Sequence, residues 1–308
     1  MGAPAPPGQS RLNRLLSMDF GQPVGLHLDL ARPRGYYLDL SVKAPEPVWP
    51  PPWHADPPAL WVDVIQYGLG CLERHLGSPD PGWLAAATAA GEYLVATQRP
   101  DAGPRRGAWL HDQPLPHTYD LPAPWVSAMA QGEAASLLVR LHDATGRLRF
   151  GDAAVAALGP MRFLTQDGGA SAVLGAGRLP EEYPSSPPSH VLNGAVFALW
   201  GLRDVAVALG DVRAGRDFEQ GAATLAGNIH RWDTGRWSRY DLFPHSRVNV
   251  ASPAYHRLHV DQLRVMDLMA PDDRFRQARE RFEEYAGSTP LRARAFAAKV
   301  RFRLGHPR

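Results

Sequence analysis

The sequence predicts a mainly α-helical fold, an (α/α) toroid or incomplete α/α barrel of helical hairpins, with a small N-terminal β-hairpin. Four segments place a Gly/Asp/Pro turn before an amphipathic helix, and a more uniformly apolar helix precedes each of them. Helices that are apolar on most faces are buried, whereas helices with one charged stripe face solvent. A side-chain amide recurs in the apolar helices about every 65 residues, at Gln66, Gln131, Asn193 and Gln262. Alternating inner and outer helices follow from this repeat.

The β-hairpin is predicted from residues 24–43, which alternate apolar and polar side chains around an Arg-Pro-Arg-Gly turn. Residues 45–60 are too rich in proline to hold a helix or a strand. We therefore expect two parts: residues 1–59 form the β-hairpin and a proline-rich connector, and residues 60–308 form the toroid.

The helices follow in hairpin pairs. We expect inner helices near 61–76, 124–142, 190–209 and 254–269, outer helices near 82–98, 149–165, 212–231 and 272–288, and a last helix near 290–304. A complete barrel needs six hairpins, so the core is expected to be an open arc. Glycine follows two of the recurring amides, Gln131 and Asn193, which predicts close helix packing at the axis. The amides there would bind substrate hydroxyls or satisfy one another.

Composition excludes several classes of protein. The formal net charge is only +2, so bulk charge predicts no nucleic-acid partner. The single cysteine, Cys71, forms no internal disulfide, and it lies in an apolar run typical of a core. No stretch reaches the roughly 20 apolar residues of a membrane span, and no signal-peptide pattern opens the chain. A cytoplasmic protein with no membrane span is therefore expected.

Three long loops, 99–123, 166–189 and 232–253, join each outer helix to the next inner helix. Loops of this length in compact domains usually serve a site. All three join equivalent helix ends, so they are predicted to emerge at one end of the toroid and to share a cleft.

One of these loops carries the segment LPEEYPSSPPSHVLNG, which sets Glu181, Glu182 and Tyr183 on a proline-stiffened backbone. Two adjacent carboxylates suggest a hydrolase, but neighbouring residues of an extended loop point to opposite sides, so at most one enters the cleft. Tyr240 and Tyr255 lie in and after the third loop. Three phenols on or directly after these loops favour proton transfer, although each tyrosine could instead pack with its hydroxyl bonded to backbone.

The start of the last inner helix carries further polar residues. Ser252-Pro253 fits an N-cap serine with proline at the first helical position. His256 and His259 have a spacing that could ligate a metal, but no third ligand accompanies them, so no metal is predicted, and capping or substrate contact is preferred. Arg239, beside Tyr240, suits recognition of a sugar acid.

At these residues the sequence resembles the C-terminal domain of the D-glucuronyl C5-epimerase family, which converts glucuronate to iduronate in heparan-type polysaccharides. The matching stretches are IQYGLG, PWVSAMAQGEAASLL, LPEEYPSSPPSHVLNGAVFALWGL, RWDTGRWSRYDL and NVASPAYHRLHVDQL, and the resemblance covers roughly residues 60–285. It implies an α/α toroid as the catalytic domain, a β part ahead of it, no cofactor, and a homodimer that acts on a uronate-containing oligo- or polysaccharide. Animal members carry a larger β-sandwich there, and an arginine at the position of Phe243.

The resemblance implies Glu182, Tyr183, Tyr240 and Tyr255 as catalytic residues. We place in the substrate-binding set Arg239, His256, His259, Asn193, Gln131, Trp125 and Asn249. The expected reaction is C5 epimerisation of D-glucuronyl to L-iduronyl residues, which needs a base and an acid on opposite faces of the sugar ring. A phenolate base needs a nearby cation, for which Arg239 and His256 are the local candidates. A polysaccharide lyase, a glycoside hydrolase and an inactive glycan-binding scaffold are the alternatives.

Overall fold

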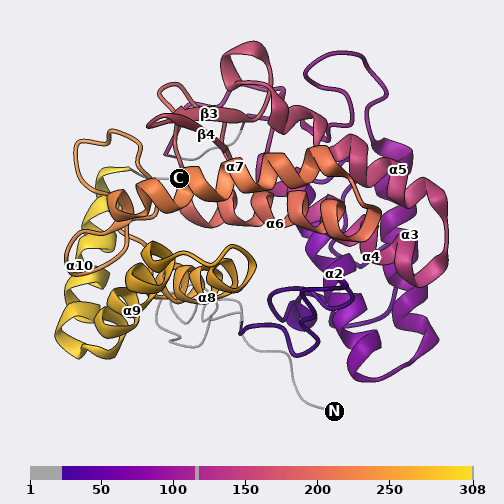
Figure 1. Ribbon diagram of the computed structural model, residues 1–308, viewed down its shortest axis with the longest axis horizontal. Helices are drawn as coiled ribbons and strands as arrows, with labels where there is room; N and C mark the ends of the chain where they lie inside the picture. The colour runs from indigo at the N-terminus through magenta and orange to yellow at the C-terminus, as the bar shows by residue number, and fades with distance from the viewer. Residues whose placement is uncertain (1–22, 115–117, 307–308) are drawn as a thin grey trace.

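The computed structural model describes residues 23–114 and 118–306, so the N-terminal stretch from which no signal peptide is predicted lies outside it. The fold is mainly α-helical, as predicted (Figure 1). The inner helices are α2 (Trp61–Gly77), α4 (Ala128–Thr145), α6 (Leu192–Leu209) and α8 (Pro253–Met269). The outer helices are α3 (Pro81–Thr97), α5 (Leu148–Ala157), α7 (Val212–Asn228) and α9 (Asp273–Gly287), and α10 (Thr289–Gly305) follows them.

Each inner helix packs against the outer helix that follows it, and the inner helices form a row from α2 through α4 and α6 to α8. The hairpin repeat read from the sequence is thus confirmed. The largest difference in a boundary is at α5, which ends at Ala157, before the predicted residue 165, because Gly159 and Pro160 break the α-helical hydrogen-bond pattern. Helix α4 spans Ala128–Thr145 where 124–142 was predicted, and α7 ends at Asn228 where 231 was predicted. Short 3-10 turns, η2 (Gly159–Arg162) and η3 (Thr165–Asp167), continue the chain.

Helices α4 and α6 approach closely at two glycines, of which Gly132 was predicted and Gly201 was not; the other predicted glycine, Gly194, meets Glu182 instead of a helix. A Cβ atom on Gly132 would lie 2.5 Å from the Cα atom of Ala198, and one on Gly201 would lie 2.3 Å from the carbonyl oxygen of Gly132. Helix α6 is also long and apolar enough to cross a membrane by composition, but 72% of that window is buried inside the protein. Its apolarity is therefore explained by its central place in the core.

The N-terminal segment differs from the predicted hairpin. Among the described residues its arms share one isolated antiparallel bridge, between Val24 and Leu38, and the 3-10 turn η1 (Ser41–Lys43) follows. Apolar residues of this segment, including the adjacent and fully buried Tyr36 and Tyr37, pack on the toroid core instead of completing a two-stranded ladder.

Regular strands form inside the long loops. Strands β1 (Leu110–His111) and β2 (Trp125–Val126) pair antiparallel, and so do β3 (Ser171–Leu174) and β4 (Gly177–Pro180). The second pair lies over α7 in Figure 1. Strand β4 ends immediately before Glu181, so this hairpin fixes the start of the carboxylate-bearing loop.

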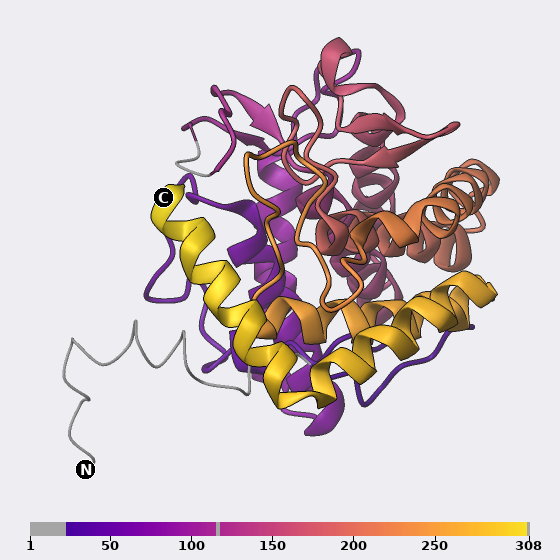
Figure 2. The ribbon, with the colours of Figure 1, turned by 90° about the vertical axis from the view of Figure 1, so that its left-hand side faces the viewer.

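The long loops meet at the N-terminal ends of the inner helices. The backbone N–H of Ala128, at the start of α4, donates to the carbonyl of Glu181, and that of Leu192, at the start of α6, donates to the carbonyl of Tyr240. Figure 2 looks onto this end of the toroid, where the loop between α7 and α8 lies behind α10. Tyr119 of the loop 99–123 also donates to Asp241 of the loop 232–253, so the three loops share one end of the fold.

Candidate active site

The adjacent carboxylates Glu181 and Glu182 have different surroundings. Glu181 is fully buried and accepts hydrogen bonds from the backbone N–H groups of Ser189 and His190 and from the Ser189 hydroxyl, at 2.8 to 3.1 Å. The ring of His190 lies 2.5 Å from Glu181, and His190 holds a left-handed backbone with φ 45°. Glu181 thus joins the start of this loop to Ser189 and His190 at its end and holds the strained backbone of His190 in place.

Glu182 lies against the first turn of α6. A Cβ atom on Gly194 would come 2.3 Å from Glu182 Oε2 and 2.5 Å from Glu182 Cβ, so only glycine admits the carboxylate here. Glu182 is 7% exposed. The expectation that at most one of the paired glutamates enters the site agrees with this arrangement.

The three predicted tyrosines lie in one cluster. Tyr183 packs on Tyr119 and Trp125, with ring centroids 5.4 Å and 6.0 Å away. Tyr240 is buried and meets Tyr255 edge-on, with centroids 5.1 Å apart. Tyr255 is 37% exposed, because Ser252 caps α8 and Pro253 begins it, which places Tyr255 in the first turn at the surface. The cap prediction is confirmed.

The hydrogen bonds of this cluster run in one order from donor to acceptor. Burial raises the pKa of Tyr183 well above its usual range, and so does the hydrogen bond to Glu182, because an ionised phenol has no proton to donate to a carboxylate. The hydrogen bond with Tyr240 lowers the pKa of Tyr183, because Tyr240 donates and stabilises a negative Tyr183 oxygen. The order is therefore Tyr240 O–H to Tyr183 O–H to the Glu182 carboxylate. Burial and the charge of Glu182 also raise the pKa of Tyr240.

A polar network lies behind Tyr240. The Lys299 ammonium, from α10, donates to Asn249 Oδ1 at 2.7 Å, and Asn249 Nδ2 donates to Asp241 Oδ2 at 2.5 Å. The hydroxyl of Tyr119 also donates to that oxygen. Lys299 Nζ lies over the Tyr240 ring, 5.1 Å from its centroid. Asn249 was predicted to bind substrate, and the structure places both ends of its amide in this network.

The two predicted histidines share one partner, the hydroxyl of Ser238. It lies 2.7 Å from His256 Nδ1 and 2.9 Å from His259 Nδ1, while His256 Nε2 lies 2.9 Å from the carbonyl of Phe282. Burial lowers the pKa of His256 to about 4, so its ring is neutral near pH 7. His256 therefore brings no positive charge to the phenols, contrary to the expectation from its place beside Tyr255.

Arg239 and Gln131 also bond to backbone groups. Arg239 is half-buried, and its Nε donates to the carbonyl of Asp241 at 3.1 Å. Gln131 is fully buried, accepts from the N–H of Trp109 and donates to the carbonyls of Gly107 and Ala157. The structure thus turns Gln131 toward α5 and away from the other inner-helix amides.

The remaining amides lie near the axis. Gln262 Nε2 donates to the backbone carbonyl of Asn193 at 3.0 Å, and Gln66 Nε2 donates to both oxygens of Glu133 at 3.1 and 3.3 Å. Burial raises the pKa of the Glu133 carboxyl to about 8, and the charge of Glu182 adds to that shift. Glu133 was not predicted as a site residue, since one glutamate in an apolar helix gives no sequence signal.

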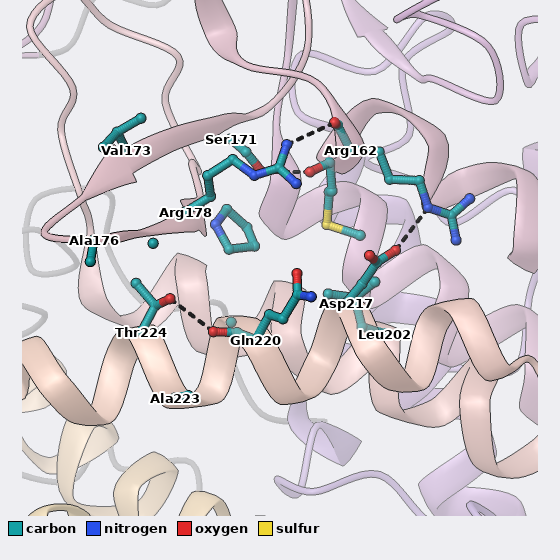
Figure 3. A pocket seen from close by; sticks show the side chains of 14 residues that line it. Arg162, Ser171, Val173, Ala176, Arg178, Leu202, Asp217, Gln220, Ala223 and Thr224 are labelled. Carbon is teal, nitrogen blue, oxygen red and sulfur yellow. Dashed lines mark hydrogen bonds and ion pairs between the residues drawn. The ribbon is translucent and has the colours of Figure 1, made fainter.

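A cavity of about 520 Å³ lies elsewhere, between the β3–β4 hairpin and α7 (Figure 3). Arg178 and Gln220 point into it, and Arg162 pairs with Asp217 at its side. None of the four predicted catalytic residues lines it. The cavity therefore takes no part in the phenol cluster.

The fold and the site together define an α/α-toroid protein with a chain of phenols that ends at a carboxylate. Residues 103–284 match the family described as D-glucuronyl C5-epimerase C-terminus, and the chain belongs to that family. A D-glucuronyl C5-epimerase of Caenorhabditis elegans is 28% identical over 217 residues, which cover 64% of this chain and 34% of that protein. The uncharacterized protein MJ1128 of Methanocaldococcus jannaschii is 26% identical over 160 residues, 49% of this chain and 50% of that protein. The matched segments thus span a third to a half of the length of these relatives.

Proposed function

We propose that this protein epimerises uronyl residues at C5, converting D-glucuronyl to L-iduronyl units in a uronate-containing glycan. One observation carries the proposal: Tyr240, Tyr183 and Glu182 form a directional hydrogen-bonded chain, and Tyr255 packs on its first member. Family membership supports the same chemistry.

The chain explains how a phenol acts as a base. The raised pKa values of Tyr183 and Tyr240 mean that both hydroxyls are protonated in the resting site. Transfer of the Tyr183 proton to Glu182 and of the Tyr240 proton to Tyr183 leaves a phenolate at Tyr240 and a neutral Glu182. No proton leaves the site, so its net charge is unchanged. A base generated in this way avoids ionising an isolated buried phenol.

The reaction then proceeds by two proton transfers at one carbon. The Tyr240 oxygen takes the C5 proton, and the electron pair of the C5–H bond delocalises into the sugar carboxylate as an enediolate. A second phenol returns a proton to C5 from the opposite face, and we assign this role to Tyr255. Its exposed position allows it to recover a proton from solvent.

The environment favours the charge that develops. Helices α4, α6 and α8 direct their N-termini toward this end of the toroid, and helix N-termini stabilise negative charge. The rings of Tyr240 and Tyr255 lie too close together to admit a sugar between them. The substrate carbon must therefore approach the two hydroxyls and not the ring faces.

The carboxylate next to Glu182 argues against a hydrolase that uses the pair. Glycoside hydrolysis needs two carboxyl groups facing one bond across a gap. Glu181 is buried and accepts from Ser189 and His190, so it does not face the phenols. A lyase shares the first step with an epimerase, and the products separate these two functions.

The test is deuterium exchange at C5. The protein is incubated in D2O with heparosan or another uronate polymer, and the sugar is analysed by NMR for deuterium at C5 and for iduronate. We expect exchange in the wild type and a loss of more than about 100-fold in Tyr240→Phe, the scale of a general acid–base contribution. Tyr93→Phe is the matched control, because the Tyr93 hydroxyl bonds to Asp56 away from the cluster. Exchange that survives in Tyr240→Phe contradicts the proposal, and an unsaturated product that absorbs in the ultraviolet identifies a lyase.

A further inference from the structure

The last helix contributes a buried ammonium group to the phenol cluster. Lys299 is one of two lysines in the chain and is 9% exposed. Its Nζ lies over two rings, 5.1 Å from the centroid of Tyr240 and 5.6 Å from that of Phe302. It lies beyond the part of the chain that matches the family, which ends at residue 284. The family match therefore assigns it no role.

Burying a charge is costly unless the site compensates it. Asn249 accepts from Lys299 and separates the ammonium from the carboxylate of Asp241, to which it donates. The structure holds the ammonium over the face of Tyr240, where an aromatic ring attracts a cation and a phenolate attracts it more strongly.

The position of Lys299 is fixed before any substrate binds. Helix α10 packs on the loop that carries Tyr240 through a small apolar cluster that includes Trp237, Val250 and Ala295. The ring of Trp237 is also held by its N–H, which donates to the carbonyl of Ala251 at 3.0 Å. The ammonium is therefore preorganised, as electrostatic stabilisation of a transient charge requires.

We propose that Lys299 is a positioning residue for the phenolate form of Tyr240: its ammonium, held by Asn249 over the ring, stabilises the negative charge that remains when the Tyr240 proton moves to Tyr183. This inference rests on the proposed function, in which Tyr240 is the base. It replaces Arg239 and His256 as the source of the cation. The step moves two protons along the chain and leaves Lys299 protonated throughout.

Several groups act on Tyr240 besides Lys299. Negative charge at Glu182, Tyr183, Tyr255 and Tyr119 opposes its ionisation. Asp241 and Arg239 flank it in sequence. His259 lies close enough to Lys299 for the ammonium to lower the histidine pKa. The opposing groups are carboxylates and phenols, so an ammonium 5.1 Å from the ring centroid acts against them.

The experiment measures ionisation at Tyr240 without substrate. Difluorotyrosine, which has a more acidic phenol, is incorporated at position 240, and its 19F NMR signal is followed as the pH is raised. The titration is repeated with Lys299→Met, with Lys299→Arg and with Lys43→Met. Lys43 is the exposed second lysine and serves as the matched control.

We expect the titration midpoint to rise by about one to two pH units in Lys299→Met, the effect of removing an opposite charge at this range. Lys299→Arg, which keeps the charge, is expected to restore most of the midpoint, and Lys43→Met to leave it unchanged. An unchanged midpoint in Lys299→Met, or an equal shift in Lys43→Met, overturns the proposal. Thermal unfolding is recorded for each variant, and Lys299→Gln replaces Lys299→Met if that variant does not fold.

Deuterium exchange with the natural tyrosine enzyme separates this inference from the proposed function. Lys299→Met is expected to lower the exchange rate by about 10- to 100-fold, because a loss of one to two pH units of stabilisation lowers the population of the Tyr240 phenolate by that factor. If the titration midpoint shifts but the wild type shows no exchange on any uronate polymer, the proposed function is contradicted and the effect of Lys299 on the Tyr240 pKa is supported. If the wild type shows exchange but the midpoint is unchanged in Lys299→Met, only the proposed role of Lys299 is contradicted.

Discussion

The contact between Gly194 and Glu182 gives the sharpest prediction for the reaction. In Gly194→Ala the new Cβ atom would lie 2.3 Å from Glu182 Oε2 and 2.5 Å from Glu182 Cβ. Carbon atoms normally approach no closer than about 3.5 Å, so the glutamate and its loop must move by about 1 Å. A displacement of that size at a reacting group costs about 100-fold in rate, or about 2.7 kcal/mol of activation free energy.

Two glycines serve as controls for this substitution. Gly132→Ala places its Cβ 2.5 Å from the Cα atom of Ala198, away from Glu182, and should destabilise the fold by about 1 to 3 kcal/mol through overpacking. Gly215→Ala meets only Ala206, at 3.7 Å, and should be neutral or slightly stabilising. Deuterium exchange per folded molecule and chemical unfolding are measured for all three. If Gly194→Ala keeps more than about a third of the wild-type exchange rate, the position of Glu182 does not control the reaction, contrary to the magnitude worked above.

Three further predictions concern stability. Because folding raises the pKa of Glu133 to about 8, the wild type should lose stability as pH rises from about 4.3 to about 8, by at most about 1.4 kcal/mol per pH unit. Glu133→Gln keeps the hydrogen bond to Gln66 and should flatten this pH dependence of stability, measured by chemical unfolding. Burial lowers the pKa of His256 to about 4, so the contribution of this histidine to the free energy of unfolding is complete above about pH 6.5 and is lost as the pH falls toward 4. His256→Gln should therefore reduce the loss of stability at acid pH in chemical unfolding, and an unchanged loss would show that another group titrates there. Asp204→Asn breaks the fully buried pair with Arg140 and should cost about 3 to 5 kcal/mol, measured by urea unfolding, while C5 exchange by the folded fraction stays within about twofold.

The sequence predicted the helical hairpins well because their signal is local. Apolar periodicity, capping residues such as Ser252 and turn glycines act within a few residues, and they place α6 and α8 within two residues of their expected bounds. The N-terminal hairpin was wrong for the opposite reason. Residues 24–43 alternate apolar and polar side chains as strands do, but the adjacent Tyr36 and Tyr37 are both buried against the inner helices, a contact that no local pattern reports.

The same difference between local sequence signals and distant contacts applies to the site. Glu182 and the three tyrosines lie in recognisable motifs, and the structure brings them together. The groups that surround them depend on distant contacts: Lys299 reaches Tyr240 from a helix far along the chain, and Gln131 turns to the backbone of Trp109. Neither contact has a spacing that a sequence pattern could reveal.

The two ends of the toroid differ: one carries the phenols and the other carries a buried ion pair. At the end opposite the phenols, Arg140 of α4 pairs with Asp204 of α6 at 2.6 Å and donates to the carbonyl of Gly35, and the hydroxyl of Tyr37 donates to Asp204. These groups are buried, so the N-terminal segment closes the inner helices at their C-terminal ends. The end where the helices begin carries the phenols, and it is also where the helix dipoles favour an anion. In the proposed reaction an anionic sugar ring would therefore meet the chain of phenols at this end of the fold, while Asp204 stabilises the other end.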